Sequence, residues 1–218
     1  MAECKVHIGF EINSVIDLFG DLARATDNPL PVRDHLELMA KRLLSGYSTR
    51  HQGTKFLVES AGINCAKIND SEFTLDDAKF CIARGYGFEF WSEVEREQKA
   101  PDANFEALID SMLKGDLDTL KKAVGRKPDL VHQCSEYPHR ATLLHYTGSN
   151  GVEAYRQVVP LNLAEIVDSL LASGADPTLE ANIYGGCTAR ELLETSKHPY
   201  ESGVIKDVLA VYERYEGV

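Results

Sequence analysis

The chain has 218 residues and a formal net charge of −11 at pH 7. An acidic surface repels phosphate backbones, so we expect no nucleic-acid partner. No apolar run approaches the roughly 20 residues needed to span a bilayer, so we expect no membrane partner. The length is sufficient for a substantial core, in one domain or in two small ones.

Cysteine usage and the first residues both indicate a cytoplasmic protein. The five cysteines are an odd number and form no Cys-x-x-Cys pair, as is usual in a reducing compartment. The first five residues lack the apolar stretch of a signal peptide. His132, Cys134 and His139 are close in sequence, but their spacing fits no recognised zinc site, so the sequence predicts neither a metal nor a cofactor.

The first 100 residues show helical spacing of apolar side chains. Pairs of capping residues predict where helices begin: Ser14 with Asp17, Asp34 with Glu37, Thr74 with Asp77, and Ser92 with Glu95. The prolines in 28–31 separate the first two helices, and Gly85 ends the third. Residues 6–12 alternate weakly, which is also compatible with a short strand.

A regular helical pattern then covers 105–113. The next helix begins at Thr142, which is followed three residues later by His145. Asn162 and Glu165 form a capping pair for its partner helix, which carries an apolar stripe. Gly174 provides the left-handed residue that ends this partner helix.

Two more helices are expected near the C-terminus. Residues 186–193 form another threonine-headed segment, with Thr188 in the capping position. Ser202 is the candidate cap of a last helix, whose apolar face runs from Val204 to Tyr212. The second half of the chain therefore predicts about three helix pairs.

The segment 141–146, followed by 164–177, resembles an ankyrin repeat. In that family the first helix opens with Thr-Pro-Leu-His and the second ends in Leu-Leu-x-x-Gly-Ala-Asp. Thr142 and His145 take the threonine and histidine places, while Leu143 stands where the family has proline. The resemblance implies that His145 bonds neighbouring backbone and that the unit binds proteins. The segment 115–120 is likewise similar to the family's tight turn into a second helix.

The resemblance also has specific departures. Thr142 and Thr188 are farther apart than the ankyrin period of about 33 residues, and the excess lies in 151–161 and 178–187. The chain from about residue 34 onward is also similar to a bacterial subgroup of stand-alone ankyrin-like proteins. Members of that subgroup often carry an N-terminal helical segment that ends in a motif like the one at 82–91.

An enzyme usually shows a recognisable constellation of residues, and the common ones do not occur in this sequence. It has no Gly-x-Ser-x-Gly elbow, no phosphate-binding Gly-x-x-x-x-Gly-Lys and no His-Glu-x-x-His. The alternative to a binding module is a small-molecule binder or enzyme built on a tyrosine–histidine cluster between the second and third repeats. Its members would be Tyr137, His139, Arg140, His145, Tyr146 and Tyr184.

The sequence thus predicts an all-α protein, in which a helical cap over 1–100 precedes a short ankyrin-like solenoid over 101–218. We expect a non-enzymatic module that binds a protein partner through repeat loops and a concave face. The expected contact residues are Tyr137, His139, Arg140, Tyr155, Arg156 and Tyr184, because tyrosine and arginine are enriched in binding hot spots. The expected structural residues are Thr142, His145, Gly174 and Thr188.

Overall fold

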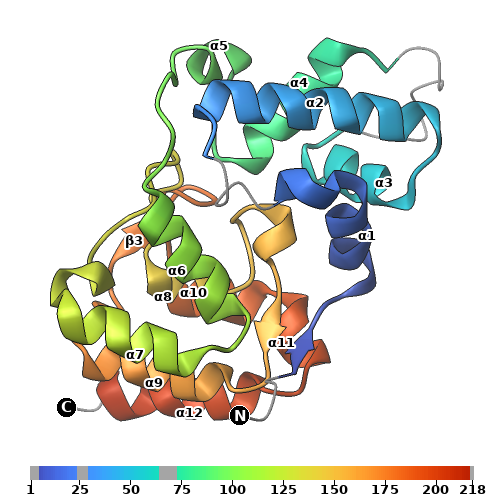
Figure 1. Ribbon diagram of the computed structural model, residues 1–218. Coiled ribbons are helices and arrows are strands. Elements are labelled where there is room, and N and C mark those ends of the chain that lie inside the picture. Colours follow the sequence, from blue (N-terminus) through green and yellow to red (C-terminus); the bar gives the residue numbers. More distant parts are fainter. Residues whose placement is uncertain (1–4, 24–28, 64–72, 217–218) are drawn as a thin grey trace. The chain divides into compact units, whose positions relative to one another are not determined.

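The computed structural model describes residues 5–23, 29–63 and 73–216. Helices predominate in these residues, and the strands form two small two-stranded sheets, which agrees with the all-α prediction (Figure 1). The chain divides into two compact units. The N-terminal unit comprises 10–103 and 153–155, and the C-terminal unit comprises 1–9, 104–152 and 156–218. Residues 5–9 thus belong with the second half of the chain, although the sequence places the helical cap over 1–100.

The N-terminal unit consists of two helix pairs and a short fifth helix. Its elements are α1 (Phe10–Phe19), the 3-10 turn η1 (Gly20–Ala23), α2 (Val32–Ser48), α3 (Gln52–Ser60), α4 (Leu75–Gly85) and α5 (Trp91–Val94). Helix α1 packs on α3, and α2 packs on α4 (Figure 1). Ile12, Leu36, Leu43 and Val58 are fully buried in this core.

One predicted helix start in this unit is confirmed, and three are wrong. Thr74 and Asp77 form the predicted reciprocal cap of α4, in which each side chain bonds the other residue's backbone N–H. Ser14 instead lies inside α1, which begins at Phe10, and its hydroxyl donates to the Phe10 carbonyl. A serine at this position back-bonds within the helix, so the pattern placed the start one turn late.

The other two wrong starts have a backbone explanation. Helix α2 begins at Val32, two residues before the predicted cap, where the Val32 N–H donates to the Lys99 carbonyl at 3.0 Å. Tertiary backbone contact thus replaces a side-chain cap. Helix α5 has Phe90 as its N-cap residue, and the Glu93 carboxylate accepts the Glu89 N–H. Of the predicted break at 28–31, residue 28 lies outside the described residues.

The crossing of α1 and α3 depends on the absence of a side chain at Gly53. A Cβ at this position would lie 2.3 Å from the carbonyl oxygen of Ser14, which belongs to the backbone of α1 and has little freedom to move. Helix α3 was not predicted, because its N-cap residue is a histidine and not the serine, threonine or aspartate of the usual pattern. His51 caps it instead, with Nδ1 accepting the Gly53 N–H.

Gly53→Ala should therefore destabilise the protein by about 1–3 kcal/mol, the usual cost of forcing extra atoms into a packed contact. Gly125→Ala is the matched control. Gly125 lies in a helix, and a Cβ there would have no atom within 4 Å. The control should be neutral or stabilise by up to about 1 kcal/mol through helix propensity. Equal unfolding midpoints in urea for the two variants would contradict this description of the crossing.

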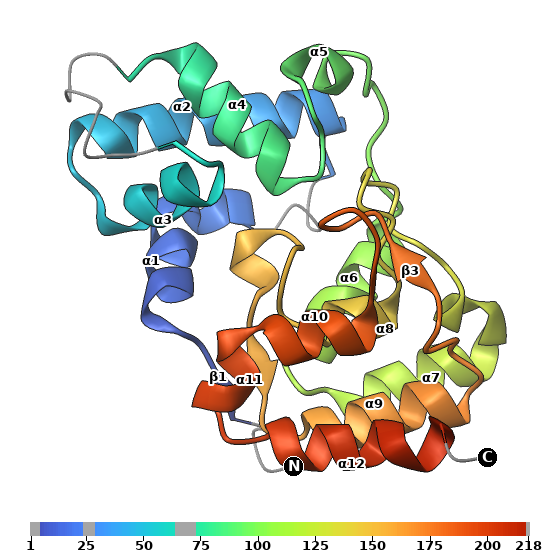
Figure 2. The ribbon, with the colours of Figure 1, turned by 180° about the vertical axis from the view of Figure 1, so that it is seen from behind.

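The C-terminal unit contains the remaining elements. They are β1 (Val6–His7), α6 (Ala103–Leu113), α7 (Leu117–Arg126), η3 (Pro128–Val131), α8 (Leu143–Tyr146), β2 (Val159–Pro160), α9 (Leu163–Ala172), β3 (Glu180–Ala181), β4 (Cys187–Thr188), α10 (Ala189–Thr195), α11 (Lys197–Glu201) and α12 (Ile205–Glu216); a further 3-10 turn, η4 (Ala154–Arg156), spans the junction of the two units. Helices α7, α9 and α12 lie side by side in both views (Figures 1 and 2). Strand β1 pairs antiparallel with β2, and β3 pairs antiparallel with β4.

The predicted helix boundaries in this unit are mostly confirmed. Thr188 and Glu191 form a reciprocal cap at the start of α10, and Gly174 has φ +91° directly after α9. Asn162 occupies the N-cap position of α9, but its side chain makes no capping bond and donates to the Gly115 carbonyl at 2.9 Å. Ser202 was wrongly expected to cap α12, which begins at Ile205. Its hydroxyl donates to Pro199 at the end of α11.

Across the described residues, no helix combines the length and the apolar character needed to cross a lipid bilayer.

Candidate binding loops and their anchor

Helix α8 is a single turn, and its start is held by a reciprocal pair of side chains. The backbone N–H of Thr142 donates to Nδ1 of His145 at 3.2 Å, and the Thr142 hydroxyl lies 2.8 Å from the same nitrogen. Both residues are buried. A four-residue helix has almost no internal hydrogen bonding, so this side-chain pair provides much of what fixes the turn.

The other side of the His145 ring reaches a distant part of the chain. Nε2 lies 3.0 Å from the carbonyl oxygen of Leu179. Because Nδ1 accepts from Thr142, Nε2 carries the hydrogen and donates to Leu179. Burial lowers the pKa of His145, which keeps the imidazole neutral and preserves this arrangement.

The backbone around this anchor forms two adjacent loops, which we call the paired loops: 134–142 and 180–188. Each is closed by an antiparallel bridge, Cys134 with Thr142 in the first and strands β3 and β4 in the second. Asn182 joins them. Its N–H donates to the His139 carbonyl at 2.8 Å, and its side-chain amide donates to the Pro138 carbonyl at 3.0 Å.

The paired loops carry two exposed side chains on strained backbone. Arg140 and Tyr184 each have φ +53°, in the left-handed region that residues other than glycine seldom adopt. Tyr184 is 74 % exposed, and its hydroxyl donates to the Asn150 side chain at 3.0 Å. Arg140 is also exposed, and its guanidinium donates to the Ser135 carbonyl. Such strain costs on the order of 1–3 kcal/mol per residue and concentrates at functional positions.

The other predicted contact residues occupy different environments. Tyr137, His139 and Arg156 are 3 %, 1 % and 4 % exposed. The rings of Tyr137 and His139 pack with centroids 5.8 Å apart, and His139 packs edge-on against Tyr146 at 5.9 Å. Tyr155 is half-buried and belongs to the N-terminal unit. Of the six predicted contact residues, only Arg140 and Tyr184 are exposed on the paired loops, where Glu136, Glu180 and Asn182 are exposed as well.

Arg156 has a structural environment that the sequence did not reveal. Its guanidinium donates to the carboxylates of Glu106 and Asp110, one turn apart on α6, and lies over the ring of Tyr146 at 5.6 Å. Arg156 and Glu106 are both buried. The two carboxylates have the spacing of one helix face, a signal visible in the sequence, but nothing there indicated that an arginine from the long insertion would meet them.

Arg156→Ala should lower the free energy of unfolding by about 3–5 kcal/mol, because it leaves the buried Glu106 without its counter-charge. The matched control is Arg214→Ala, which removes an exposed ion pair with Asp168 and should cost at most about 1 kcal/mol. Urea denaturation of both variants measures the difference. If Arg156→Ala unfolds like the control, the buried cluster contributes no net stability.

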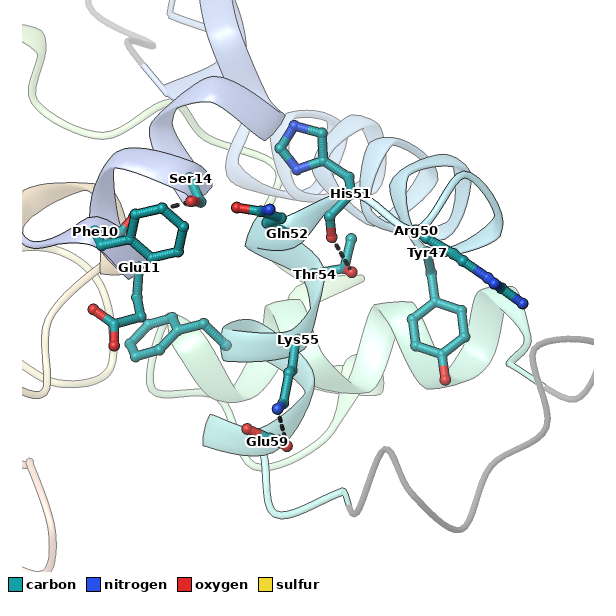
Figure 3. A pocket seen from close by; sticks show the side chains of 11 residues that line it. Phe10, Glu11, Ser14, Tyr47, Arg50, His51, Gln52, Thr54, Lys55 and Glu59 are labelled. Carbon is teal, nitrogen blue, oxygen red and sulfur yellow. Dashed lines mark hydrogen bonds and ion pairs between the residues drawn. The ribbon is translucent and has the colours of Figure 1, made fainter.

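The N-terminal unit holds a separate cavity of about 640 Å³ that the sequence did not predict (Figure 3). It lies among α1, the end of α2 and α3, and it is lined by Phe10, Glu11, Ser14, Tyr47, Arg50, His51, Gln52, Thr54, Lys55, Phe56 and Glu59. Its lining includes acidic, basic and aromatic side chains, and Lys55 pairs with Glu59 on its wall. The cavity was missed because half of its lining comes from the unpredicted α3.

Comparison of the sequence with protein-family models, with curated proteins and with solved structures finds no match.

His145→Ala should destabilise the protein by roughly 1–3 kcal/mol, since it strands buried hydrogen-bonding groups of Thr142 and Leu179. The pH dependence follows from the lowered pKa. Below about pH 6.5, His145 takes up a proton in the unfolded chain, whereas its lowered pKa disfavours that proton in the folded protein. The contribution of His145 to the free energy of unfolding is therefore lost as the pH falls. Denaturation at pH 7.5 and pH 5 should therefore show a smaller pH effect in the variant than in the parent. An identical pH effect in both would contradict the assignment.

Proposed function

We propose that the protein is a non-enzymatic binding module and that the paired loops contact a protein partner through Arg140 and Tyr184. The observation that supports this most strongly is the combination of exposure and left-handed backbone at both residues. Two large side chains with polar ends stand on loops that are tied together through Asn182. Arginine and tyrosine are the residue types that contribute most often to binding hot spots.

The rigidity of the loops favours binding. Hydrogen bonds from Arg140 to Ser135 and from Tyr184 to Asn150 restrict both side chains before a partner arrives. Ordering a flexible side chain costs about 0.5–1.5 kcal/mol at an interface, so a restricted surface loses less on association. The net charge of −11 favours a partner with a basic surface, because opposite potentials accelerate encounter.

An ankyrin-like architecture is part of this proposal. Helices α6 with α7, α8 with α9, and α10 with α12 correspond in order to the three expected helix pairs. The Thr142–His145 pair and the two loops that it connects support the resemblance, since the family uses these residues to bond neighbouring backbone. In this proposal the loops and the first helices of each pair form the concave binding face.

A small-molecule site is the second candidate function, and the cavity in the N-terminal unit favours it over the tyrosine–histidine cluster. Tyr137, His139 and Tyr146 are buried and pack against one another, so their rings occupy the space that a ligand would need. The cavity of about 640 Å³ lies within the usual range of ligand sites, roughly 300–1,000 Å³. Its mixed charges suit a small polar ligand with both an acidic and a basic group.

Alanine substitution of Arg140 and Tyr184 tests the main proposal. The full-length protein is used to capture partners from cytosol, and the affinity of a purified captured protein is then measured. Each substitution should weaken binding by about 2 kcal/mol, or roughly 30-fold, while the melting temperature stays close to that of the parent.

Tyr200→Ala is the matched control, because Tyr200 is an exposed tyrosine on α11 and does not belong to the paired loops. It should bind like the parent. If Arg140→Ala and Tyr184→Ala bind as well as this control, the interface lies elsewhere and the proposal is rejected.

A further inference from the structure

Three metal-ligating side chains converge at β1 and α11 within the C-terminal unit. His7 lies on β1, and His198 and Glu201 lie one turn apart on α11. Nε2 of His7 is 3.5 Å from Oε2 of Glu201, and Nδ1 of His198 is 3.7 Å from the same oxygen. The three ligand atoms all lie within 4.8 Å of one another. Among the described residues no other group of this kind comes together.

The backbone fixes all three residues in place. His7 pairs with Val159 in the antiparallel β1–β2 ladder, which fixes the position of its backbone. His198 is 4 % exposed, and its i, i+3 spacing from Glu201 puts both side chains on one side of α11. The Glu201 side chain is 45 % exposed, which leaves the group reachable by an ion from solvent.

The separations suit a metal ion better than direct hydrogen bonds. A tetrahedral zinc ion with bonds of about 2.0–2.2 Å to nitrogen and oxygen places its ligand atoms roughly 3.3–3.5 Å apart. The separations of 3.5 and 3.7 Å are close to this value, whereas ordinary N–H···O bonds are about 2.7–3.2 Å long. Nε2 of His7 is also buried with no hydrogen-bond partner among the described residues, and a bound ion is one explanation for such an atom.

The backbone of Gly9 lies close to these ligand atoms, and a side chain there would collide with them. A Cβ at this position would lie 2.9 Å from Nδ1 of His198 and 3.7 Å from Oε2 of Glu201. Gly9 does not have a left-handed φ, so the backbone conformation does not demand glycine there. What the missing side chain allows is the close approach of this backbone to the His198 ring.

We propose that His7, His198 and Glu201 bind a divalent transition-metal ion of the zinc class. Two imidazoles and one carboxylate are a ligand set that such ions accept, and three protein ligands leave a further position for water. The bound ion links residues 5–9 to α11. Metal binding therefore adds to the stability that the β1–β2 hydrogen bonds already provide. The His-x-x-Glu spacing at 198–201 was the sequence signal for this site, but His7 is too distant along the chain to be joined to it by pattern alone.

The test uses untagged, full-length protein that has been treated with a chelator and kept reduced. It is titrated with Co²⁺ and followed by absorption, and then with Zn²⁺ in competition with a chromogenic chelator. One equivalent should bind, with a spectrum of nitrogen and oxygen ligands and no thiolate charge-transfer band. His7→Ala, His198→Ala and Glu201→Gln should each weaken binding by about 100-fold or more, since loss of even an outer partner typically costs 10–100-fold.

His132→Ala is the matched control, because His132 is exposed beside Cys134 and could bind zinc adventitiously. This variant should bind like the parent. Gly9→Ala adds a test that keeps all three ligands, and it should weaken binding because its Cβ would lie 2.9 Å from Nδ1 of His198 and displace the ring. Melting curves in chelator identify any variant that fails to fold. If a histidine variant fails to fold, the affinity of Glu201→Gln decides the test, because Glu201 is exposed and its substitution disturbs the fold least. Absence of stoichiometric binding, a thiolate band, or equal affinity in Glu201→Gln and the parent would overturn the proposal.

Discussion

The neutral ring of His145 is the constraint on which the C-terminal unit depends most. Helix α8 has only one turn, so its own backbone cannot hold the segments around it. His145 accepts from Thr142 on one side and donates to Leu179 on the other, and in this way it sets the position of both paired loops. Protonation of Nδ1 would remove the acceptor that Thr142 uses. Burial disfavours that protonation and makes the arrangement stable near neutral pH.

The buried ion pairs of Arg156 hold in place the long insertion that separates α8 from α9. Arg156 brings its charge to two carboxylates of α6 and covers the ring of Tyr146 in α8. The insertion is therefore tied to α6 and α8 instead of extending as a free loop. His145 and Arg156 each use one side chain to fix several backbone segments. Arg140 and Tyr184 can then remain exposed on left-handed backbone, because the loops that carry them are held elsewhere.

Much of the secondary structure could be predicted from the sequence, and the errors have physical causes. Local capping chemistry identified the starts of α4 and α10, since Thr74 and Thr188 bond residues only three positions away. It failed at α2, where the free N–H of Val32 reaches the distant Lys99 carbonyl. The site was harder to predict. Tyrosine and arginine content selected six contact residues without showing that Tyr137 and Arg156 would be buried, because burial is set by tertiary neighbours such as Glu106.

The central claim is that His145 holds the paired loops together as one surface. Hydrogen–deuterium exchange at the backbone N–H of Asn182, which donates to the His139 carbonyl, measures this most directly. In His145→Ala, the protection of the Asn182 amide should fall sharply. Amides within α6 and α7 should lose only as much protection as the lower free energy of unfolding of the variant removes. If Asn182 remains as protected as in the parent while the rest of the C-terminal unit is unchanged, the loops are held by other contacts and the account is contradicted.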